Sequence, residues 1–173
     1  MLNVINGMGQ GNSANTLDGL SYNLRGIAMK FLVHNTSGVT AIVRLAIIRA
    51  KSGQTISTIG EELLTGSAQV GLDYSSATEY QRYYCPINTK KYDVIMQRTF
   101  KIGAKNTVGT SNYDCNKLIK GYKPFKNKKE YLNASGDPDT NYYIVGWCID
   151  TNMDNSAITL EVTGETTVYY KDN

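Results

Sequence analysis

Apolar side chains occupy every second position of one short segment, Ile27-Ala28-Met29-Lys30-Phe31-Leu32-Val33-His34. Successive side chains of a strand point to opposite faces, so this alternation predicts a strand with one buried face. The next segment, Val39 to Arg49, is apolar at both parities, which is typical of a strand in the middle of a sandwich whose outer face is covered by a neighbour. The turn-forming residues between the two segments, Asn35-Thr36-Ser37-Gly38, predict a hairpin.

Period-two patterns continue to the end of the chain. They predict strands at Tyr92 to Ile102, where Arg98 interrupts the apolar parity, around Leu118 to Tyr131, at Tyr142 to Ile149 and from Ile158 to Tyr170. Pro124 cannot donate to a ladder, so its strand is expected at an edge or bulge, and Gly164 is expected to mark a bend or bulge. Helical patterns are confined to Ile59 to Leu64 and Thr78 to Tyr84, which predicts short connections.

These elements predict an all-β fold, an antiparallel β-sandwich of the jelly-roll type with short helical connections. A length of 173 residues fits one domain. We expect residues 1–19 to form a glycine-rich leader and residues 20–173 to form a single jelly-roll domain. Gly7, Gly9 and Gly11 do not make a phosphate loop, because no Gly-Lys-Ser/Thr accompanies them and no helix is expected after them.

The formal net charge of +3 is unevenly distributed. Residues 1–89 carry six basic and five acidic side chains, residues 90–131 carry eleven and three, and residues 132–173 carry one and seven, so the three blocks have net charges of +1, +8 and −6. Opposite charge on opposite faces would help identical subunits to dock and would present a basic side to a polyanion. A scattered, solvated surface is the equally supported alternative.

The basic block contains six closely spaced lysines interleaved with Tyr122, Phe125 and Tyr131. Lysines bind phosphate and aromatic rings stack on bases, so the pattern predicts sequence-independent binding of single-stranded nucleic acid. Lysines on an edge strand also prevent aggregation, and this structural alternative stays open. The predicted nucleic-acid-binding residues are Lys117, Lys120, Lys123, Lys126, Lys128 and Lys129.

Catalytic, cofactor and metal sites are not expected. His34 is the only histidine and is predicted to be a surface or interface residue, and Cys85, Cys115 and Cys148 lack metal or redox spacing and are expected to be reduced. The acidic residues with a possible role in calcium binding lack the alternating pattern of a calcium loop: Asp137, Asp139, Asp150 and Asp154. No segment approaches the ~20 apolar residues of a membrane span, so no membrane partner is expected.

The order of motifs resembles the jelly-roll coat proteins of small circular Rep-encoding single-stranded DNA viruses, the group with geminivirus-like and circovirus-like members. The likeness covers nearly the whole chain and rests on six segments: Asn6 to Gly11 leading to Asp18-Gly19, Val43 to Arg49, Lys91 to Phe100, Phe125 to Tyr131, Tyr142 to Trp147, and Ile158 to Tyr170 followed by Lys171-Asp172-Asn173. Each motif alone is weak.

This resemblance implies a capsid protein without enzymatic activity. About 60 identical copies would assemble into a small icosahedral shell around a single-stranded DNA genome, in virions assembled in the host nucleus. Two departures stand out: Thr16-Leu17 stands where that family commonly has an arginine, and no arginine-rich arm precedes the domain. The absent arm implies either that the chain is truncated or that packaging relies on the folded domain. About 60 subunits of charge +3 give about +180, against about a thousand phosphates per kilobase, and this deficit favours truncation.

Two rival functions come from other classes. A carbohydrate-binding sandwich module, lectin-like or a fibre-tip domain, would stack Trp147 or surface tyrosines on sugar rings. Trp147 lies in an apolar strand at core parity, which disfavours that role. An enzyme on a jelly-roll scaffold of the cupin type would need several histidines, and the chain has one.

Overall fold

The structure is a computed structural model. It describes residues 2–3, 9–10, 16–17, 21–51, 63–65, 71–72, 77–105, 113–131, 140–152 and 157–172. Six long strands dominate these residues: β4 (Ser21–Asn35), β5 (Ala41–Ala50), β8 (Tyr92–Ile102), β9 (Asn116–Tyr131), β10 (Tyr142–Asp150) and β11 (Leu160–Asp172). The shorter elements are β1 (Leu2–Asn3), β2 (Gly9–Gln10), β3 (Thr16–Leu17), β6 (Leu64–Thr65), β7 (Gly71–Leu72), α1 (Glu79–Tyr84) and the 3-10 turn Tyr113–Cys115.

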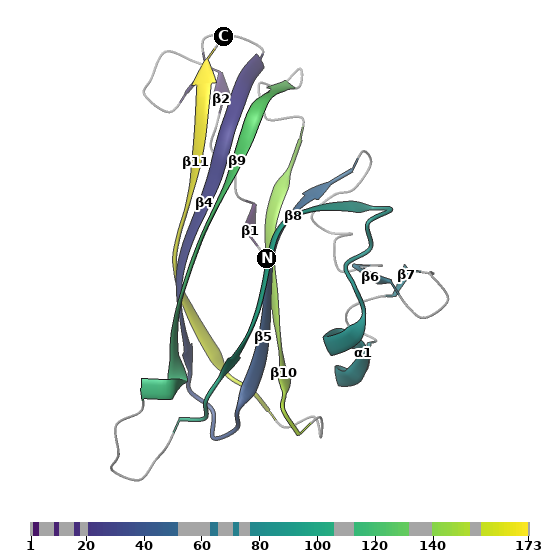
Figure 1. The fold of residues 1–173 in the computed structure, drawn as a ribbon, viewed down its shortest axis with the longest axis vertical. Helices are drawn as coiled ribbons and strands as arrows, with labels where there is room; N and C mark the ends of the chain where they lie inside the picture. Colours follow the sequence, from purple (N-terminus) through teal and green to yellow (C-terminus); the bar gives the residue numbers. More distant parts are fainter. Residues whose placement is uncertain are drawn as a thin grey trace.

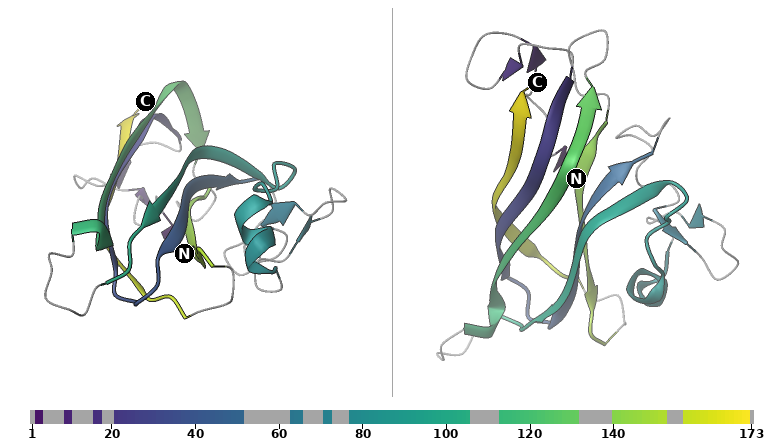
Figure 2. Two further views of the ribbon diagram at one scale, coloured as in Figure 1. Left: turned by 60° about the horizontal axis from the view of Figure 1, so that its bottom comes forward. Right: turned by 45° about the horizontal axis from the view of Figure 1, so that its top comes forward.

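The long strands form two antiparallel sheets that pack face to face (Figures 1 and 2). One sheet has the order β11-β4-β9, and the other has the order β1-β10-β5-β8. The first long strand, β4, pairs with the last, β11, and the second, β5, pairs with the last but one, β10. This nested pairing is that of a chain folded back on itself. The predicted all-β antiparallel sandwich is therefore confirmed, and its topology is jelly-roll-like.

The predicted hairpin between the first two long strands is wrong, because β4 and β5 lie in different sheets. Both edges of β4 are already occupied, by β11 and by β9, so the chain crosses to the other sheet after Asn35. The buried amide of Asn35 holds this crossing, since its Nδ2 donates to the carbonyl oxygens of Val39 and Gly103 at 2.8 Å each.

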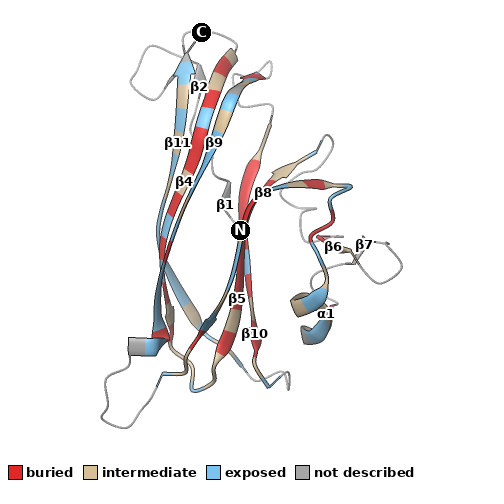
Figure 3. Cartoon of the chain, viewed as in Figure 1, coloured by how far each residue is buried: buried red, intermediate tan, exposed pale blue. Residues whose placement is uncertain are grey.

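The main core lies between the two sheets. The alternating residues predicted to face inward on β4, Ile27, Met29, Phe31 and Val33, are all buried, and they pack against Val43, Leu45 and Ile47 of β5. Burying each such side chain contributes roughly 1.5–3 kcal/mol. Figure 3 shows the buried residues concentrated along β4, β5 and β10, with exposed residues on β9 and β11.

A second core lies on the opposite face of β5. Ala46 and Ile48 pack with Tyr143 and Val145 of β10 and with the connection between β5 and β8, which supplies Leu63, Leu64, Ala77 and Ile87. The neighbour expected to cover the apolar outer face of β5 is thus a segment of the same chain, seen beside the sheet in Figure 1. α1 lies in this connection and begins with a capping box, in which the Thr78 hydroxyl accepts from the backbone of Gln81.

Arg44 attaches this connection to the sheet. Its buried guanidinium donates to the carbonyl oxygens of Arg82, Tyr83 and Cys85 at the end of α1, at 2.6, 3.1 and 2.9 Å. These are the carbonyl groups that a helix leaves without partners at its C-terminus. The guanidinium also lies 4.7 Å from the ring centroid of Trp147, which is buried as its core parity predicted and donates to the Arg82 carbonyl.

The individual expectations for the later strands have mixed outcomes. β9 is an edge strand that pairs only with β4, and Pro124 lies opposite Gly26 where the register shifts, as its missing N–H predicted. Pairing continues through Gly164, and the irregularity of β11 falls between Tyr169 and Tyr170 instead. An added Cβ at Gly164 would collide with the Lys30 carbonyl oxygen, so the residue serves a close backbone approach.

The helical and turn expectations are tested only in part. The segment Thr78 to Tyr84 contains α1 as expected, whereas Leu64, at the end of the other predicted helical segment, lies in β6. Residues 59–62 and the turn Asn133 to Asp139 lie outside the described residues. In the predicted leader, β1 adds to the edge of β10, and β2 pairs in parallel with β3.

Candidate nucleic-acid interface

Five of the six predicted binding lysines are exposed on β9: Lys117, Lys120, Lys123, Lys126 and Lys129. Their placement follows from the strand they occupy, because an edge strand presents side chains to solvent on both sides. The sixth lysine, Lys128, is only half-exposed and ion-paired. The structure therefore divides the sequence-predicted set into a solvent-facing group of five and one partly buried, ion-paired member.

The exposed lysines do not share one face. Lys120 lies opposite Lys30 of β4, on the side of the sheet that points away from the core. Lys117 and Lys123 lie opposite Val33 and Ile27, so they leave β9 on the core-facing side and reach solvent only because the strand is at the sheet edge.

Lys117 and Lys123 face the edge strand of the other sheet. β8 and β9 approach each other at two points. At the first, the Met96 sulfur fills the space beside Gly121 and lies 2.5 Å from the position that a Cβ added to Gly121 would take. At the second, just beyond the strand ends, the Gly103 N–H donates to the Asp114 carbonyl at 2.9 Å. Between these two points β8 carries the exposed Arg98, opposite the core-facing Leu45. We call Arg98, Lys117 and Lys123 the basic seam.

Arg98 was not among the residues predicted to bind nucleic acid. The sequence does contain a signal for it, because Arg98 stands at a position of β8 where the alternation predicts an apolar, core-facing residue. A cation at such a position can reach solvent only where the sandwich is open. Only the pairing of β8 with β5, and its contact with β9, places that cation near the lysines. A row of exposed cations along the edge of a sandwich can follow a phosphate backbone without reading base sequence.

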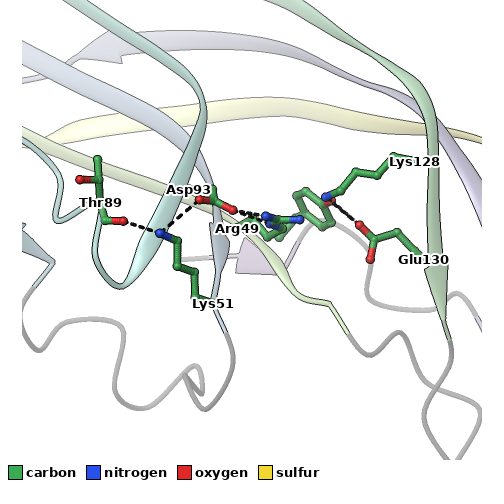
Figure 4. A network of polar contacts seen from close by, with 7 residues as sticks. Arg49, Lys51, Thr89, Asp93, Lys128 and Glu130 are labelled. Carbon is green, nitrogen blue, oxygen red and sulfur yellow. Dashed lines mark hydrogen bonds and ion pairs between the residues drawn. The ribbon is translucent and has the colours of Figure 1, made fainter.

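Lys128 belongs to a buried polar network (Figure 4). Its Nζ lies 2.7 Å from Glu130 Oε1 and donates to the Tyr142 hydroxyl at 2.6 Å, and that hydroxyl donates to Glu130 Oε1 at 2.9 Å. The β-bulge between Leu24 and Gly26 places Lys128 opposite Leu24 and Glu130 opposite Tyr22, both completely buried. The bulge thus turns this lysine towards the core.

The network shifts the acidity of its members. Burial raises the pKa of the Glu130 carboxyl, but hydrogen bonds from Lys128, Thr140 and Tyr142, with the charge of Lys128, outweigh burial and leave that pKa below its usual value. Burial, followed by the Glu130 charge, raises the pKa of the Tyr142 hydroxyl. Lys128 therefore neutralises an internal carboxylate.

A second ion-pair network engages two further cations near the end of β5. Arg49 Nε donates to Asp93 Oδ2 at 2.8 Å and its Nη2 contacts the same oxygen, while Lys51 Nζ lies 3.5 Å from Asp93 Oδ1 (Figure 4). Lys51 also donates to the Thr89 carbonyl at 2.5 Å. These two cations are paired with a carboxylate, so they are poorer phosphate ligands than the basic seam.

The aromatic residues interleaved with the lysines likewise fall into an exposed group and one that packs against the core. Tyr122 and Tyr131 are 56% and 55% exposed and could stack on bases. Phe125 packs against the core, with its ring centroid 6.3 Å from that of Tyr142. Lys129 lies over the Tyr131 ring at 5.4 Å, which places a cation and a stacking surface together.

His34 contacts both a cysteine and an asparagine, but not in the geometry of a nucleophile and its base. Its Nδ1 lies 2.6 Å from Asn116 Oδ1 and 4.0 Å from the sulfur of the buried Cys115. With that amide assignment, Nδ1 carries the proton that the Asn116 oxygen accepts, so the same nitrogen cannot take a proton from the thiol. All three cysteines are free thiols, as expected.

Among the described residues there is no group of three His, Cys, Asp or Glu side chains that could hold a metal ion. Of the acidic residues considered for calcium, Asp137, Asp139 and Asp154 lie outside the described residues. Asp150 is fully buried, and its Oδ1 accepts from the Asn152 N–H at 2.9 Å, whereas Oδ2 has no hydrogen-bond partner.

An apolar cavity of about 630 Å³ opens between the sheets beside β10 and β11. Phe31, Val33, Leu45, Ile144 and Leu160 contribute to its lining, which otherwise consists of apolar residues, two glycines and Cys148. A specific small-molecule site adds a few well-placed polar groups to such a lining, and this cavity has none of the charged or amide side chains that would orient a ligand.

The fold and surface thus define an antiparallel β-sandwich with a basic edge. No protein-family model and no curated protein sequence matches the chain. In the part of the chain that the structure describes, no helix is long and apolar enough to cross a membrane.

Proposed function

We propose that this protein is a viral coat protein whose sandwich assembles with copies of itself into a closed shell around single-stranded DNA. The observation that carries the proposal is the exposed apolar surface of the β11-β4-β9 sheet. Leu32 and Leu118 form one exposed apolar pair and Tyr122 and Tyr169 form another, on either side of the Lys120-Lys30-Glu165 row, and all four side chains are between 46% and 56% exposed. Large apolar side chains gathered on one exposed sheet face mark an interaction surface.

Closed symmetry would turn such contacts into a stable particle. Each subunit makes the same few contacts with several neighbours at once, so individually weak contacts combine into a strong assembly. The sandwich suits this role because its two sheets, locked by a common core, repeat one rigid geometry in every copy. The virion, with assembly in the host nucleus, is the corresponding location.

The basic seam supports the nucleic-acid part of the proposal. Arg98, Lys117 and Lys123 are exposed cations with no acidic ion-pair partner among the described residues. They would contact phosphates sequence-independently, as a coat requires when it packages a whole genome. The carbohydrate-binding alternative has less support, because Trp147, its strongest candidate for stacking on a sugar, is buried.

Electron microscopy and analytical ultracentrifugation of the purified chain test the assembly. We expect closed particles of uniform diameter, in equilibrium with small oligomers, over a range of ionic strength. A chain that stays monomeric at every concentration and salt tested, with or without single-stranded DNA, would contradict the proposal.

A further inference from the structure

The outward-facing side chains of the β11-β4-β9 sheet form cross-strand rows. We call this surface the outer face and define it by four rows, each read from β9 through β4 to β11: Asn116-His34-Glu161, Leu118-Leu32-Thr163, Lys120-Lys30-Glu165 and Tyr122-Ala28-Thr167. The neighbouring β4 residues, Ile27 to Val33 at alternate positions, are buried on the other side. The outer face is therefore the side of this sheet that points away from the core.

Its apolar part is ordered within the subunit. The Tyr122 ring meets the ring of Tyr169, which lies opposite Gly26 just beyond the four rows, edge to face across β4 with centroids 5.8 Å apart. Gly26 leaves the space that the Tyr122 ring fills, since a Cβ there would lie 2.5 Å from the Tyr122 hydroxyl oxygen. A preformed aromatic pair loses little side-chain entropy when a partner covers it.

The outer face carries equal numbers of positive and negative side chains, with lysine on its β9 side and glutamate on its β11 side. Lys120 lies on the β9 flank and Glu165 on the β11 flank of the same row, and both are exposed. Neither has an ion-pair partner among the residues that the structure describes. With Lys30 and Glu161, the four rows carry two lysines and two glutamates. A neutral, polarised surface suits a copy of itself better than a polyanion.

A two-fold axis parallel to β4 makes this surface self-complementary. Rotation by 180° about that axis places β9 of one copy over β11 of the other while each row stays level with itself. Lys120 then faces Glu165 of the second copy, Glu165 faces its Lys120, and Tyr122 faces its Thr167. An axis across the strands would place the β9 lysines of both copies against each other, which like-charge repulsion disfavours.

We infer that two copies of this chain associate through their outer faces, with the sheets stacked about an axis along β4 and with Lys120 paired to Glu165 across the interface. Stacked sheets pack about 10 Å apart with nearly aligned strands, as this arrangement requires. The inference rests on the proposed self-assembly and names one of its contacts.

Charge reversal tests the pairing. Lys120→Glu and Glu165→Lys, made singly, each place like charges opposite one another twice in the dimer, so we expect each to raise the dissociation constant in sedimentation experiments by about tenfold or more. The double variant restores opposite charges and is expected to return to near the wild-type value. Lys126→Glu is the matched control, because Lys126 is exposed on the same strand outside the four rows.

The outcomes separate this interface from the broader proposal. If wild-type protein associates and the double variant is no better than the single variants, this interface is overturned while self-assembly stands. If the wild type never associates, both are overturned. If the single variants keep the wild-type dissociation constant but change their affinity for DNA, the outer face is a nucleic-acid surface, and the inference also fails.

Cysteine cross-linking tests the direction of the axis. Lys120→Cys combined with Glu165→Cys is expected to give a dimer cross-linked by a short bis-maleimide, because facing residues of sheets stacked about 10 Å apart are too distant for a disulfide. Lys120→Cys alone is expected to remain uncross-linked at that position, and cross-linking of the single variant would put the axis across the strands and overturn the proposed pairing. The free thiols Cys85, Cys115 and Cys148 are controlled for by the wild-type protein treated with the same reagent.

Discussion

Lys128 and Glu130 are separated by one residue on β9, yet both point towards the core, and their charged groups lie 2.7 Å apart. They share a side of the strand because side chains two positions apart do so. Glu130 is the buried member of this pair, and the Tyr142 hydroxyl also donates to its carboxylate. This lysine therefore acts on the stability of the sandwich, whereas the exposed lysines of β9 are free to act on a partner.

Removing the Lys128 charge is expected to destabilise the fold. Lys128→Met leaves the buried Glu130 carboxylate without its cation, and such a loss costs about 2–4 kcal/mol of unfolding free energy. Chemical denaturation measures the change. Lys129→Met, beside it but exposed, is expected to stay within about 0.5 kcal/mol of wild type. Equal losses in the two variants would contradict the internal role of Lys128.

Stability is expected to fall in acid. The pKa of the Glu130 carboxyl is lowered in the folded protein, so its contribution is complete above the unfolded pKa of about 4.3 and disappears as the pH falls through the lower folded pKa. The pKa of Asp93 is likewise lowered, because Arg49 and Lys51 outweigh its burial. Denaturation between pH 7 and 3 should show a plateau and then a decline. Glu130→Gln should lower the plateau and flatten part of that decline.

Nucleic-acid binding is expected to depend on the basic seam and to weaken steeply with salt. For single-stranded DNA, the logarithm of affinity falls with the logarithm of salt concentration by about 0.7 for each phosphate contact. Replacing Arg98, Lys117 and Lys123 by glutamine should reduce this slope by about 2 when fluorescence anisotropy is measured across salt concentrations.

Two observations would contradict that assignment. The first is binding by the wild type that does not change with salt. The second is a salt-dependence slope that stays unchanged in the triple variant but falls in the control variant Lys51→Gln. Lys51 is the appropriate control because it is already paired with Asp93.

Arg44 is expected to hold the connection between β5 and β8 against the sheet. Arg44→Met keeps the length of the side chain but removes the guanidinium donor from the carbonyl groups of Arg82, Tyr83 and Cys85, while the Arg82 carbonyl keeps the Trp147 indole N–H, so we expect a loss of about 2–3 kcal/mol. Limited proteolysis should cut faster within residues 52–91 than elsewhere. Cleavage that accelerates equally in all loops would indicate general unfolding instead.

Several features of the fold were predictable because they depend on neighbouring residues alone. The alternation from Ile27 to Val33 identified the core-facing side of β4, and the parity of Trp147 identified it as buried. The missing N–H of Pro124 indicated an edge or bulge, and β9 has both at this point. Local geometry sets these properties whatever the rest of the chain does.

The candidate site was less predictable. The six lysines look equivalent in sequence, but the bulge opposite Pro124 turns Lys128 inward and leaves the other five exposed. Arg98 joins the basic seam only because β8 and β9 are edges of different sheets that meet at Gly121. Such contacts join residues far apart in the chain, and no local pattern records them.

The long strands, the core-facing side of β4 and the concentration of positive charge near β9 follow from the sequence alone. Tertiary structure decided that β4 and β5 cross between sheets, because β9 and β11 occupy both edges of β4. It also decided that Lys120 and Glu165 flank one exposed row. Side-chain parity follows from the covalent geometry of an extended chain, whereas strand partners follow from competition among distant segments for the same hydrogen bonds.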